Sequence, residues 1–506
     1  MKVATTGASP KQTRVKVATT GASPEQARVK VATTGASPKQ ARVKVATTGA
    51  SPKQARVKVA TTGASPKQAR VKVATAGASP KQARVKVATK ESLFASIRVI
   101  LYRLFDSMLY FSNSYICIPN AMLKGTFPIE KFKKLETPFY YYDIKLLQET
   151  LNVVKAESGK YGYHVHYAIK ANANPRLLSL IAQNGFGADC VSGGEIKAAL
   201  EAGFPNDKIV FAGVGKADWE INLGLDNDIF CFNVESIAEL EVIEELAARK
   251  NKTAPVALRI NPEVDAHTHA KITTGMKENK FGINLSQLPT TLERMKGMRH
   301  AKLIGIHCHI GSQITDMSAF RNLVIRMNEI QEELEKSGTS VENLNFGGGL
   351  GIDYYHPNHL PIPAFDNYFA VFNKLLEKRP GQQIHFEPGR SIVAQCGSLI
   401  SRVLYVKEGE TKKFAILDAG FTDLIRPAMY DAYHRIENIS SDEPTEIYDV
   451  VGPICESSDV FAKDYELNKA HRGDLLALRS AGAYGEIMAS RYNCRALPRA
   501  YYSDEL

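Results

Sequence analysis

The residues best suited to chemistry lie at the ends of short apolar segments in the C-terminal three-quarters of the chain. Lys170 ends one such segment, Tyr167–Lys170, and is followed by small and polar residues, Ala171 to Asn174. A neutral lysine amine is a nucleophile toward carbonyl compounds. A lysine at a strand end is by itself more typical of a solvated side chain, so a catalytic role depends on what lies around it.

Two histidines follow in a later segment, His307-Cys308-His309, just before Gly311 and Ser312. Alternation along a strand places both histidines on one face and Cys308 on the other, so the three cannot bind one metal ion together. We therefore expect no metal site. The position of His309 beside the Gly-Ser pair suits stacking on a flat ring.

Two further loops carry glycines and an arginine. Residues 347–349 are three consecutive glycines, and Glu387-Pro388-Gly389-Arg390 follows the next apolar run. Glycine backbones can close on phosphate oxygens, and the last two loops of an α/β barrel are its usual phosphate site. With Lys170 and His309, these groups are the parts that hold pyridoxal 5′-phosphate, where Glu387 would keep the ring nitrogen protonated.

Eight short apolar runs must position these groups, and most of the runs are followed by a helical pattern. Helical periodicity is clear at Ser236–Arg249 and Ala319–Glu335. Eight strand–helix units over roughly 230 residues predict a closed (β/α)8 TIM-type barrel, and an open doubly wound sheet is the alternative. The runs are His164–Lys170, Gly187–Val191, Ile209–Ala212, Ile229–Phe232, Val256–Ile260, Leu303–Ile310, Leu344–Phe346 and Ile384–Glu387.

After the barrel the pattern changes to strands with few helices. These strands are expected at Leu399–Val406, Lys413–Leu417, Thr445–Val451 and Asp474–Leu478, and Phe139–Tyr142 is expected to join them. An amphipathic helix is expected near Leu146–Ala156. The predicted domains are a cofactor-binding barrel at residues 150–395 and a β-rich domain formed by residues 122–149 with 396–506 that completes the active site.

The N-terminus consists of tandem repeats. The unit KVATTGASPKQARV recurs six times with a period of 14 from Lys2 to Val85. Each unit lacks aromatic residues and contains a Gly-Ala-Ser-Pro turn, so residues 1–90 are expected to be disordered. The repeats are either a basic arm that binds nucleic acid or an anionic surface, or a tandem DNA repeat translated in frame, or the result of a start codon placed too early. Residues 91–121 are expected to be a linker, and a chain starting at Met122 is expected to keep full activity.

Charge and cysteine content restrict the class of protein. Residues 1–90 hold 19 Lys/Arg and one acidic residue, Glu25, so the rest of the chain, with 45 basic and 52 acidic residues, is mildly acidic. We expect no nucleic-acid partner for the enzyme part. Seven cysteines without a CxxC pair indicate reduced thiols in a cytoplasm. Charged residues interrupt the apolar stretch Leu93–Ile118, so no membrane span is expected.

These motifs resemble those of the diaminopimelate decarboxylase family, within the fold type III, alanine-racemase-like enzymes that use pyridoxal phosphate. The resemblance covers about Met122 to Leu506. It is carried by YAIKAN (167–172), DCVSGGE (189–195), RINPEVDAHTHAKITTG (259–275), KFGI (280–283), HIGSQ (309–313), NFGGGLGI (345–352), EPGR (387–390), DAGFTDLIRPAMYDAYH (418–434), GPICESSD (452–459) and GAYGEIMASRYN (482–493).

The resemblance implies a carboxy-lyase that converts meso-2,6-diaminopimelate to L-lysine and CO2, the last step of lysine biosynthesis by this route. It implies that Lys170 carries the cofactor and that Cys455 is the proton donor. It also implies a homodimer in which the Cys-Glu segment enters the neighbouring subunit's site. The implied cofactor-binding residues are Lys170, His309, Ser312, Gly349, Glu387, Pro388, Gly389, Arg390 and Tyr484, and the implied substrate-binding residues are Arg390, Arg426, Tyr430, Glu456 and Tyr484.

Other functions on this fold remain as alternatives. Ornithine or arginine decarboxylases act on substrates without a distal carboxylate, which Arg426 and Glu456 argue against. An alanine-racemase-type enzyme would have an arginine instead of Glu387 at the ring nitrogen. A non-catalytic pyridoxal-phosphate protein would lack the second domain. A cofactor-free aldolase barrel would not need the glycine and Glu387–Arg390 loops.

Overall fold

The computed structural model describes residues 125–264 and 280–506, and also the backbone of seven strands in the N-terminal repeats. The chain divides into two compact units, Met1–Ala121 and Met122–Leu506. The second unit contains every residue that the sequence assigns to a site.

In the first unit the repeats form strands. They are β1 (Lys2–Thr6), β2 (Gln12–Thr20), β3 (Gln26–Thr34), β4 (Gln40–Thr48), β5 (Gln54–Thr62), β6 (Ala69–Ala76) and β7 (Ala83–Ala88). They pair in parallel in two sheets, β1-β3-β5-β7 and β2-β4-β6, so that each position lies beside the same position two repeats on. The Arg-Val-Lys-Val alternation in each unit has the period of a strand. The expectation that residues 1–90 are disordered stays a prediction.

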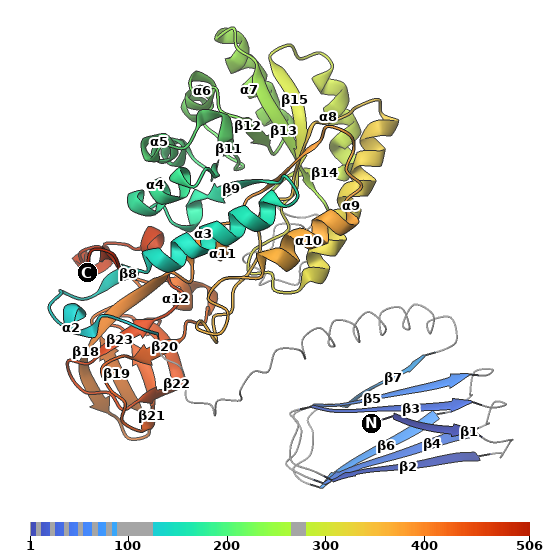
Figure 1. The fold of residues 1–506 in the computed structure, drawn as a ribbon, viewed down its shortest axis with the longest axis vertical. Helices are drawn as coiled ribbons and strands as arrows, with labels where there is room; N and C mark the ends of the chain where they lie inside the picture. Colours follow the sequence, from blue (N-terminus) through green and yellow to red (C-terminus); the bar gives the residue numbers. More distant parts are fainter. Residues whose placement is uncertain are drawn as a thin grey trace. The chain divides into compact units, whose positions relative to one another are not determined.

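In the second unit, the eight expected apolar runs form a closed parallel barrel (Figure 1). The strand order is β12-β11-β10-β9-β17-β16-β15-β13, and pairing of β12 with β13 closes the ring. This closure confirms the barrel and excludes the open sheet. The strands are β9 (His164–Ala168), β10 (Gly187–Cys190), β11 (Ile209–Phe211), β12 (Cys231–Val234), β13 (Ala254–Asn261), β15 (Ala301–His307), β16 (Asn343–Asn345) and β17 (Gln383–Phe386), and the short β14 (Ile283–Asn284) pairs with β13.

Two barrel strands, β9 and β15, end more than one residue earlier than the sequence predicts. Strand β9 stops at Ala168, so Lys170 lies in the short 3-10 turn η1 (Ile169–Ala171) that follows it. Strand β15 stops at His307, so His309 lies in the next loop. Both side chains remain at the carboxyl end of the barrel, where loops rather than strand interiors carry function.

Helices surround the barrel, and local sequence explains where they begin. Asp143 accepts a hydrogen bond from Leu146 N–H at the start of α3, and Ser236 accepts one from Glu239 N–H at the start of α7. In α9 the buried residues recur at helical spacing. The main helices are α3 (Ile144–Gly159), α4 (Pro175–Gln183), α5 (Gly193–Ala202), α6 (Asp218–Asp226), α7 (Ile237–Arg249), α8 (Leu288–Met295), α9 (Met317–Lys336) and α10 (Phe365–Leu375).

The second domain is a mixed sheet in the order β20-β23-β18-β19-β21-β22. Strand β8 (Phe139–Tyr142) joins it as expected, between β18 and β24, so segments far apart in the chain lie side by side (Figure 1). The four expected strands are present as β18 (Gly397–Glu408), β19 (Lys413–Leu417), β21 (Thr445–Val451) and β23 (Leu475–Leu478). The sequence analysis missed β20 (Ile436–Asn438), β22 (Val460–Asn468) and β24 (Arg499–Tyr502).

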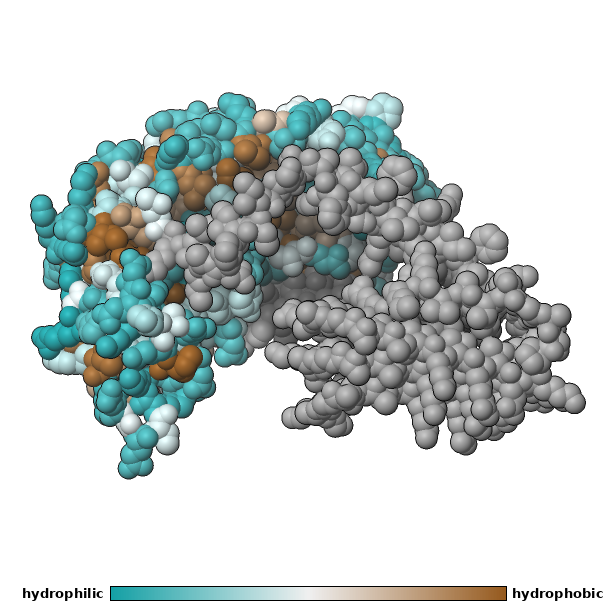
Figure 2. Space-filling model, turned by 60° about the horizontal axis from the view of Figure 1, so that its bottom comes forward, coloured by the Kyte–Doolittle hydropathy of each residue, from teal (hydrophilic) through white to brown (hydrophobic). Residues whose placement is uncertain are grey.

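The boundary expected between residues 149 and 150 falls within helix α3, which packs against α10 of the barrel. The chain therefore passes from the sheet to the barrel near Asp143. On the face drawn in Figure 2, hydrophobic residues occur as separate patches among hydrophilic ones. Within the described ranges, the structure contains no helix with the length and apolar character that a membrane crossing requires.

Candidate active site

A cavity of about 450 Å³ lies at the carboxyl ends of the barrel strands. Nearly all of its lining comes from the barrel, and the second domain adds a tyrosine. Eight residues that the sequence assigns to the site line this cavity: Lys170, His309, Ser312, Gly349, Glu387, Gly389, Arg390 and Tyr484.

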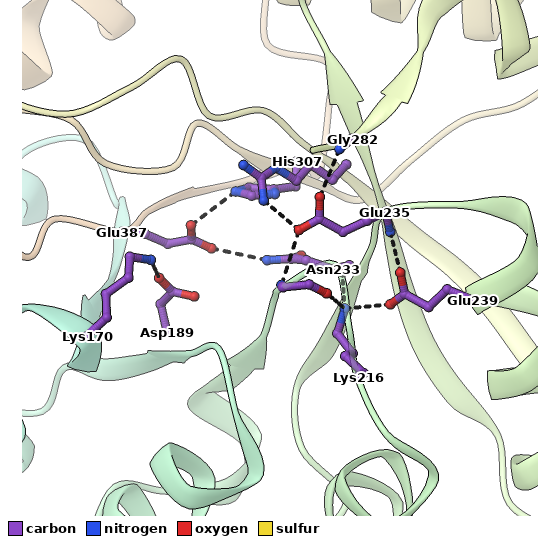
Figure 3. Close-up of polar contacts among 11 residues, drawn as sticks. Lys170, Asp189, Lys216, Asn233, Glu235, Glu239, Gly282, His307 and Glu387 are labelled. Atoms are coloured by element: carbon purple, nitrogen blue, oxygen red, sulfur yellow. Dashed lines mark hydrogen bonds and ion pairs between the residues drawn. The ribbon is translucent and has the colours of Figure 1, made fainter. Parts of the chain in front are cut away.

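Lys170 projects from the turn after β9 toward Asp189 on β10 (Figure 3). Its Nζ lies 2.8 Å from Asp189 Oδ2, and its side chain is 38% exposed whereas Asp189 is fully buried. Burial alone would lower the pKa of Lys170, but the negative charge of Asp189, with Tyr484 and Glu387, raises it above its usual value. The amine is therefore held as an ammonium that still faces the cavity.

The sequence analysis gave Asp189 no role, although this residue opens the DCVSGGE motif. An acidic residue in an otherwise apolar four-residue strand, with all four positions buried, is a signal that could have identified it.

Glu387 directly follows β17 and is held by three donors. Asn345 Nδ2 donates to its Oε1 over 2.6 Å and Asn233 Nδ2 over 3.2 Å, while His307 Nε2 lies 3.0 Å from its Oε2. Burial would raise the pKa of Glu387, but His307 and Lys170 outweigh it and lower the pKa below its ordinary value. Glu387 is therefore a fixed carboxylate at the floor of the cavity.

His309 lies in the loop after β15 with a neutral ring. Gly348 N–H donates to His309 Nδ1 over 3.2 Å, so this nitrogen carries no proton. Burial and the positive charges of Arg259 and Lys170 hold the pKa of His309 well below its usual value. A flat, uncharged imidazole at the wall of the cavity fits the expected stacking surface.

The triple glycine allows three loops to approach one another closely. A Cβ on Gly348 would lie 2.2 Å from the carbonyl oxygen of Glu387, and one on Gly349 would lie 2.8 Å from that of Gly311. Gly349 also has a φ of +108°, which side chains disfavour. Glycine is therefore required here for backbone packing, and Gly349 lines the cavity together with Ser312.

Arg390 and Arg426 share one hydroxyl group. Arg390 Nη1 donates to Tyr354 Oη over 2.6 Å and Arg426 Nη1 over 2.9 Å, while Arg390 Nη2 donates to Ser312 Oγ over 3.0 Å. Arg426 also donates to His434 Nε2 over 3.0 Å, and burial with the charge of Arg426 lowers the pKa of His434 to about 3. Tyr354 was not identified from sequence.

None of these partners carries a full negative charge, and both arginines are 6% exposed. In the described part of the chain, the buried Nε of Arg390 also has no hydrogen-bond partner. Burial would raise the pKa of Tyr354, but the two guanidinium groups lower it. Two buried cations with a free donor are a site for an anion, because their desolvation is otherwise uncompensated.

Five of the expected site residues lie outside the cavity lining, and one of them is Arg426, whose contacts are given above. Pro388 belongs to the same loop, where its carbonyl accepts a hydrogen bond from Ala168 N–H over 3.2 Å. Tyr430 ends α12 (Arg426–Tyr430). Cys455 and Glu456 follow β21 and are exposed, and Glu456 accepts a hydrogen bond from Tyr492 Oη over 2.5 Å. A single chain does not bring these last two residues to Lys170.

The donor set fits pyridoxal phosphate. Lys170 offers an amine, Glu387 a fixed carboxylate and His309 a flat ring. Ser312 and Arg390, whose buried Nε has no hydrogen-bond partner in the described structure, offer donors for an anion. No group of three or more His, Cys, Asp or Glu side chains that could hold a metal ion occurs among the residues the structure describes.

The chain is similar to known decarboxylases over most of its second unit. Residues 146–394 match the pyridoxal-binding domain of the pyridoxal-dependent decarboxylases. A diaminopimelate decarboxylase from Bacteroides thetaiotaomicron is 65% identical over 385 residues, which are 76% of this chain and 100% of that protein. One from Zymomonas mobilis is 42% identical and covers 75% of this chain and 92% of its own length.

Solved structures agree with these relatives. The crystal structure of diaminopimelate decarboxylase from Helicobacter pylori complexed with L-lysine is 38% identical with a TM-score of 0.71, covering 75% of this chain and 94% of that one. The diaminopimelate decarboxylase structure from M. jannaschi is 39% identical with a TM-score of 0.70, covering 74% and 89%. The chain therefore belongs to the diaminopimelate decarboxylase family of the pyridoxal-phosphate-dependent decarboxylases.

Proposed function

We propose that this chain decarboxylates meso-2,6-diaminopimelate to L-lysine and CO2, the last step of lysine biosynthesis by the diaminopimelate route. The observation that carries this proposal is the 65% identity to a diaminopimelate decarboxylase over the whole length of that relative. Two solved relatives in complex with L-lysine, the product, also support it. The cofactor is pyridoxal phosphate.

When bound, pyridoxal phosphate supplies a ring that accepts the electron pair left on carbon as CO2 departs. We assign Lys170 to carry it, which requires the ammonium to lose its proton first. Glu387 would hold a proton on the ring nitrogen, a role suited to a carboxylate that three donors keep ionised. His309 would pack on the ring, while Ser312, Gly349 and the Pro388–Arg390 segment would hold the phosphate end together with Tyr484.

For the substrate, we assign Arg390, Arg426, Tyr430 and Tyr484 to binding, with Arg426 at the distal carboxylate. The uncompensated charge of the two arginines suits a carboxylate, since guanidinium and carboxylate form paired hydrogen bonds. Ornithine and arginine lack this second carboxylate and would leave the buried Arg426 without an anion. The site therefore favours diaminopimelate over those substrates, and a non-catalytic role would leave the same charges unused.

We propose that a second copy of the chain supplies Cys455 and Glu456. Both residues are exposed and outside the cavity of their own chain, which supports a shared site in a homodimer. The Cys455 thiol would give its proton to the carbon that has lost CO2 and become a thiolate, and Glu456 would bind the distal ammonium. The six cysteines in the described ranges are all free, in keeping with our proposal of a cytoplasmic enzyme.

The direct test is to incubate the purified protein with pyridoxal phosphate and meso-diaminopimelate and to measure lysine and CO2 in equal amounts. Lys170→Ala should form neither, and ornithine should not be turned over. Turnover of ornithine without turnover of diaminopimelate would show that the chain is a decarboxylase of another amino acid. Lysine formation by Lys170→Ala would remove this lysine from the mechanism.

A further inference from the structure

A buried network of four charged side chains lies beside the cavity. It consists of Lys216, Glu235, Glu239 and Arg259, of which Figure 3 labels the first three. All four side chains are at most 8% exposed. Lys216 Nζ pairs with Glu239 Oε1 at 2.5 Å, and Arg259 Nη1 pairs with Glu235 Oε1 at 2.5 Å. The family resemblance gives none of the four a role.

Glu235, just after β12, joins three separate segments through one carboxylate. Its Oε1 accepts the Arg259 hydrogen bond and one from Gly213 N–H over 3.2 Å. Its Oε2 accepts one from Gly282 N–H over 2.8 Å. The loop after β11, the end of β13 and the residues before β14 are thereby held at fixed positions relative to β12.

Each of these segments contributes to the cavity, although Glu235 does not. Gly213, Arg259 and Phe281 line it, and the Arg259 guanidinium lies 4.8 Å from the centre of the Phe281 ring. Lys216 Nζ also donates to the Asn233 carbonyl over 2.8 Å, and the Asn233 side chain donates to Glu387. Movement of Glu235 would therefore displace one wall of the cavity. Through β12 and Asn233, it would also shift Glu387 at the floor.

Stability alone does not account for such a network. Buried ion pairs lose about as much in desolvation as they gain in attraction, and apolar side chains of similar size often serve the fold equally well. The two cations and two anions do balance, so no net charge is buried. The remaining physical benefit is that the network fixes the positions of its side chains, because charged hydrogen bonds are strong and directional.

We propose that Glu235 is a positioning residue for the active site, which sets the place and orientation of Arg259 at the cavity wall for the bound cofactor. This inference rests on the proposed function for the identity of the cofactor. The test compares Glu235→Gln, Arg259→Gln and the double variant. Affinity of the apoenzyme for pyridoxal phosphate is measured by titration, and the absorbance of the bound coenzyme and kcat are measured in the holoenzyme.

Glu235→Gln should weaken coenzyme binding by about tenfold or more, as expected for the loss of a hydrogen bond to a charged group. It should also lower kcat by up to about 100-fold, since small misplacements in a site have effects of this size. Because Glu235 acts mainly through Arg259, the loss of coenzyme affinity in the double variant should be clearly smaller than the sum of the two single losses. Fully additive losses would overturn the proposal.

Glu437→Gln is a matched control in the second domain. Glu437 is also a buried carboxylate that accepts hydrogen bonds from two arginines and one backbone N–H, from Arg435, Arg479 and Gly125. It should lower the melting temperature and leave coenzyme affinity and absorbance unchanged. An equal loss of affinity in both variants would show that Glu235 has only a structural role and would overturn the proposal.

If Glu235→Gln does not fold by circular dichroism, Arg259→Lys and Arg259→Gln replace it. Both should weaken coenzyme binding, and binding equal to wild type in both would overturn the proposal. The coenzyme titration needs no substrate, so it remains informative if diaminopimelate is not the substrate. Failure of lysine formation in the wild type would instead count against the proposed function.

Discussion

The two ends of the cavity are built differently. At the barrel floor, Glu387 accepts three hydrogen bonds and Lys170 faces a buried carboxylate, so the charges in this part are compensated within one chain. At the arginine end, which is formed by Arg390 and Arg426, both side chains donate to the neutral hydroxyl of Tyr354, and Arg390 Nε has no partner in the described structure. The charges at the floor are thus compensated without a ligand, whereas the arginine end needs an anion and, we propose, a second chain.

This difference has an energetic meaning. Compensated buried charges cost little net free energy, whereas two uncompensated buried cations store unfavourable energy that an anionic ligand can relieve. Variants at the floor should therefore affect cofactor chemistry for every substrate. Variants at the arginine end should affect the choice of substrate and can even stabilise the free protein.

The largest effect is expected at the floor, where Lys170→Ala removes the amine. Lysine formation should fall by roughly four orders of magnitude or more, as when a covalent nucleophile is removed from an enzyme. The rate of CO2 release reports this loss, and far-UV circular dichroism checks that the variant is folded. A Lys170→Ala variant that kept substantial activity would show that the chemistry does not depend on the floor of the cavity.

The second-largest effect is expected from Cys455, which we propose a second chain supplies to the site. Cys455→Ala should lower kcat by about 100- to 10,000-fold through loss of the proton donor. When Cys455→Ala and Lys170→Ala are mixed and allowed to exchange subunits, roughly a quarter of wild-type activity should return, because half of the dimers are mixed and each has one intact site. Mixing without any recovery would indicate that each chain holds a complete site.

At the arginine end, Arg426→Gln should lower kcat/KM for diaminopimelate by roughly 100-fold, because the distal carboxylate loses a buried charged partner. Coenzyme affinity should change little. Arg472→Gln, which alters an exposed arginine over the ring of Tyr405, is a suitable control and should behave as wild type. A large loss of coenzyme affinity in Arg426→Gln would place this arginine at the cofactor end instead.

The smallest effect is expected from Asp189→Asn, which keeps the shape of the side chain and removes its charge. The pKa of Lys170 should fall, so the apoenzyme should capture pyridoxal phosphate at lower pH than wild type does. The pH dependence of the capture rate measures this shift. An unchanged pH dependence would mean that Asp189 does not control the charge of Lys170.

The same ion pair has a defined effect on stability. Because the folded pKa of Lys170 lies above the ordinary value of 10.5, the stability it contributes is complete below pH 10.5 and is lost as pH rises through the folded pKa. Between pH 7 and 9, roughly, the wild type should show no change in melting temperature from this group.

Much of the barrel and several site positions follow from local sequence. Eight apolar runs with helical segments between them predict the strands, and the ends of those runs predict that Lys170, His309 and Glu387 meet at one edge. Asp189, Tyr354 and Glu235 were not predicted as site residues. Each acts through a side chain distant in sequence, as when Tyr354 receives hydrogen bonds from arginines 36 and 72 residues away.

The sequence by itself determined the period of each element, the order of the motifs and therefore the family of the chain. These properties depend on neighbouring residues, because strand and helix periods differ and glycines mark the loops. Only the tertiary structure decided how the barrel closes between β12 and β13, and that β8 and β24 pair although some 360 residues separate them. It also decided which buried charges are compensated. Compensation depends on distances across the closed barrel, and no local pattern in the chain specifies them.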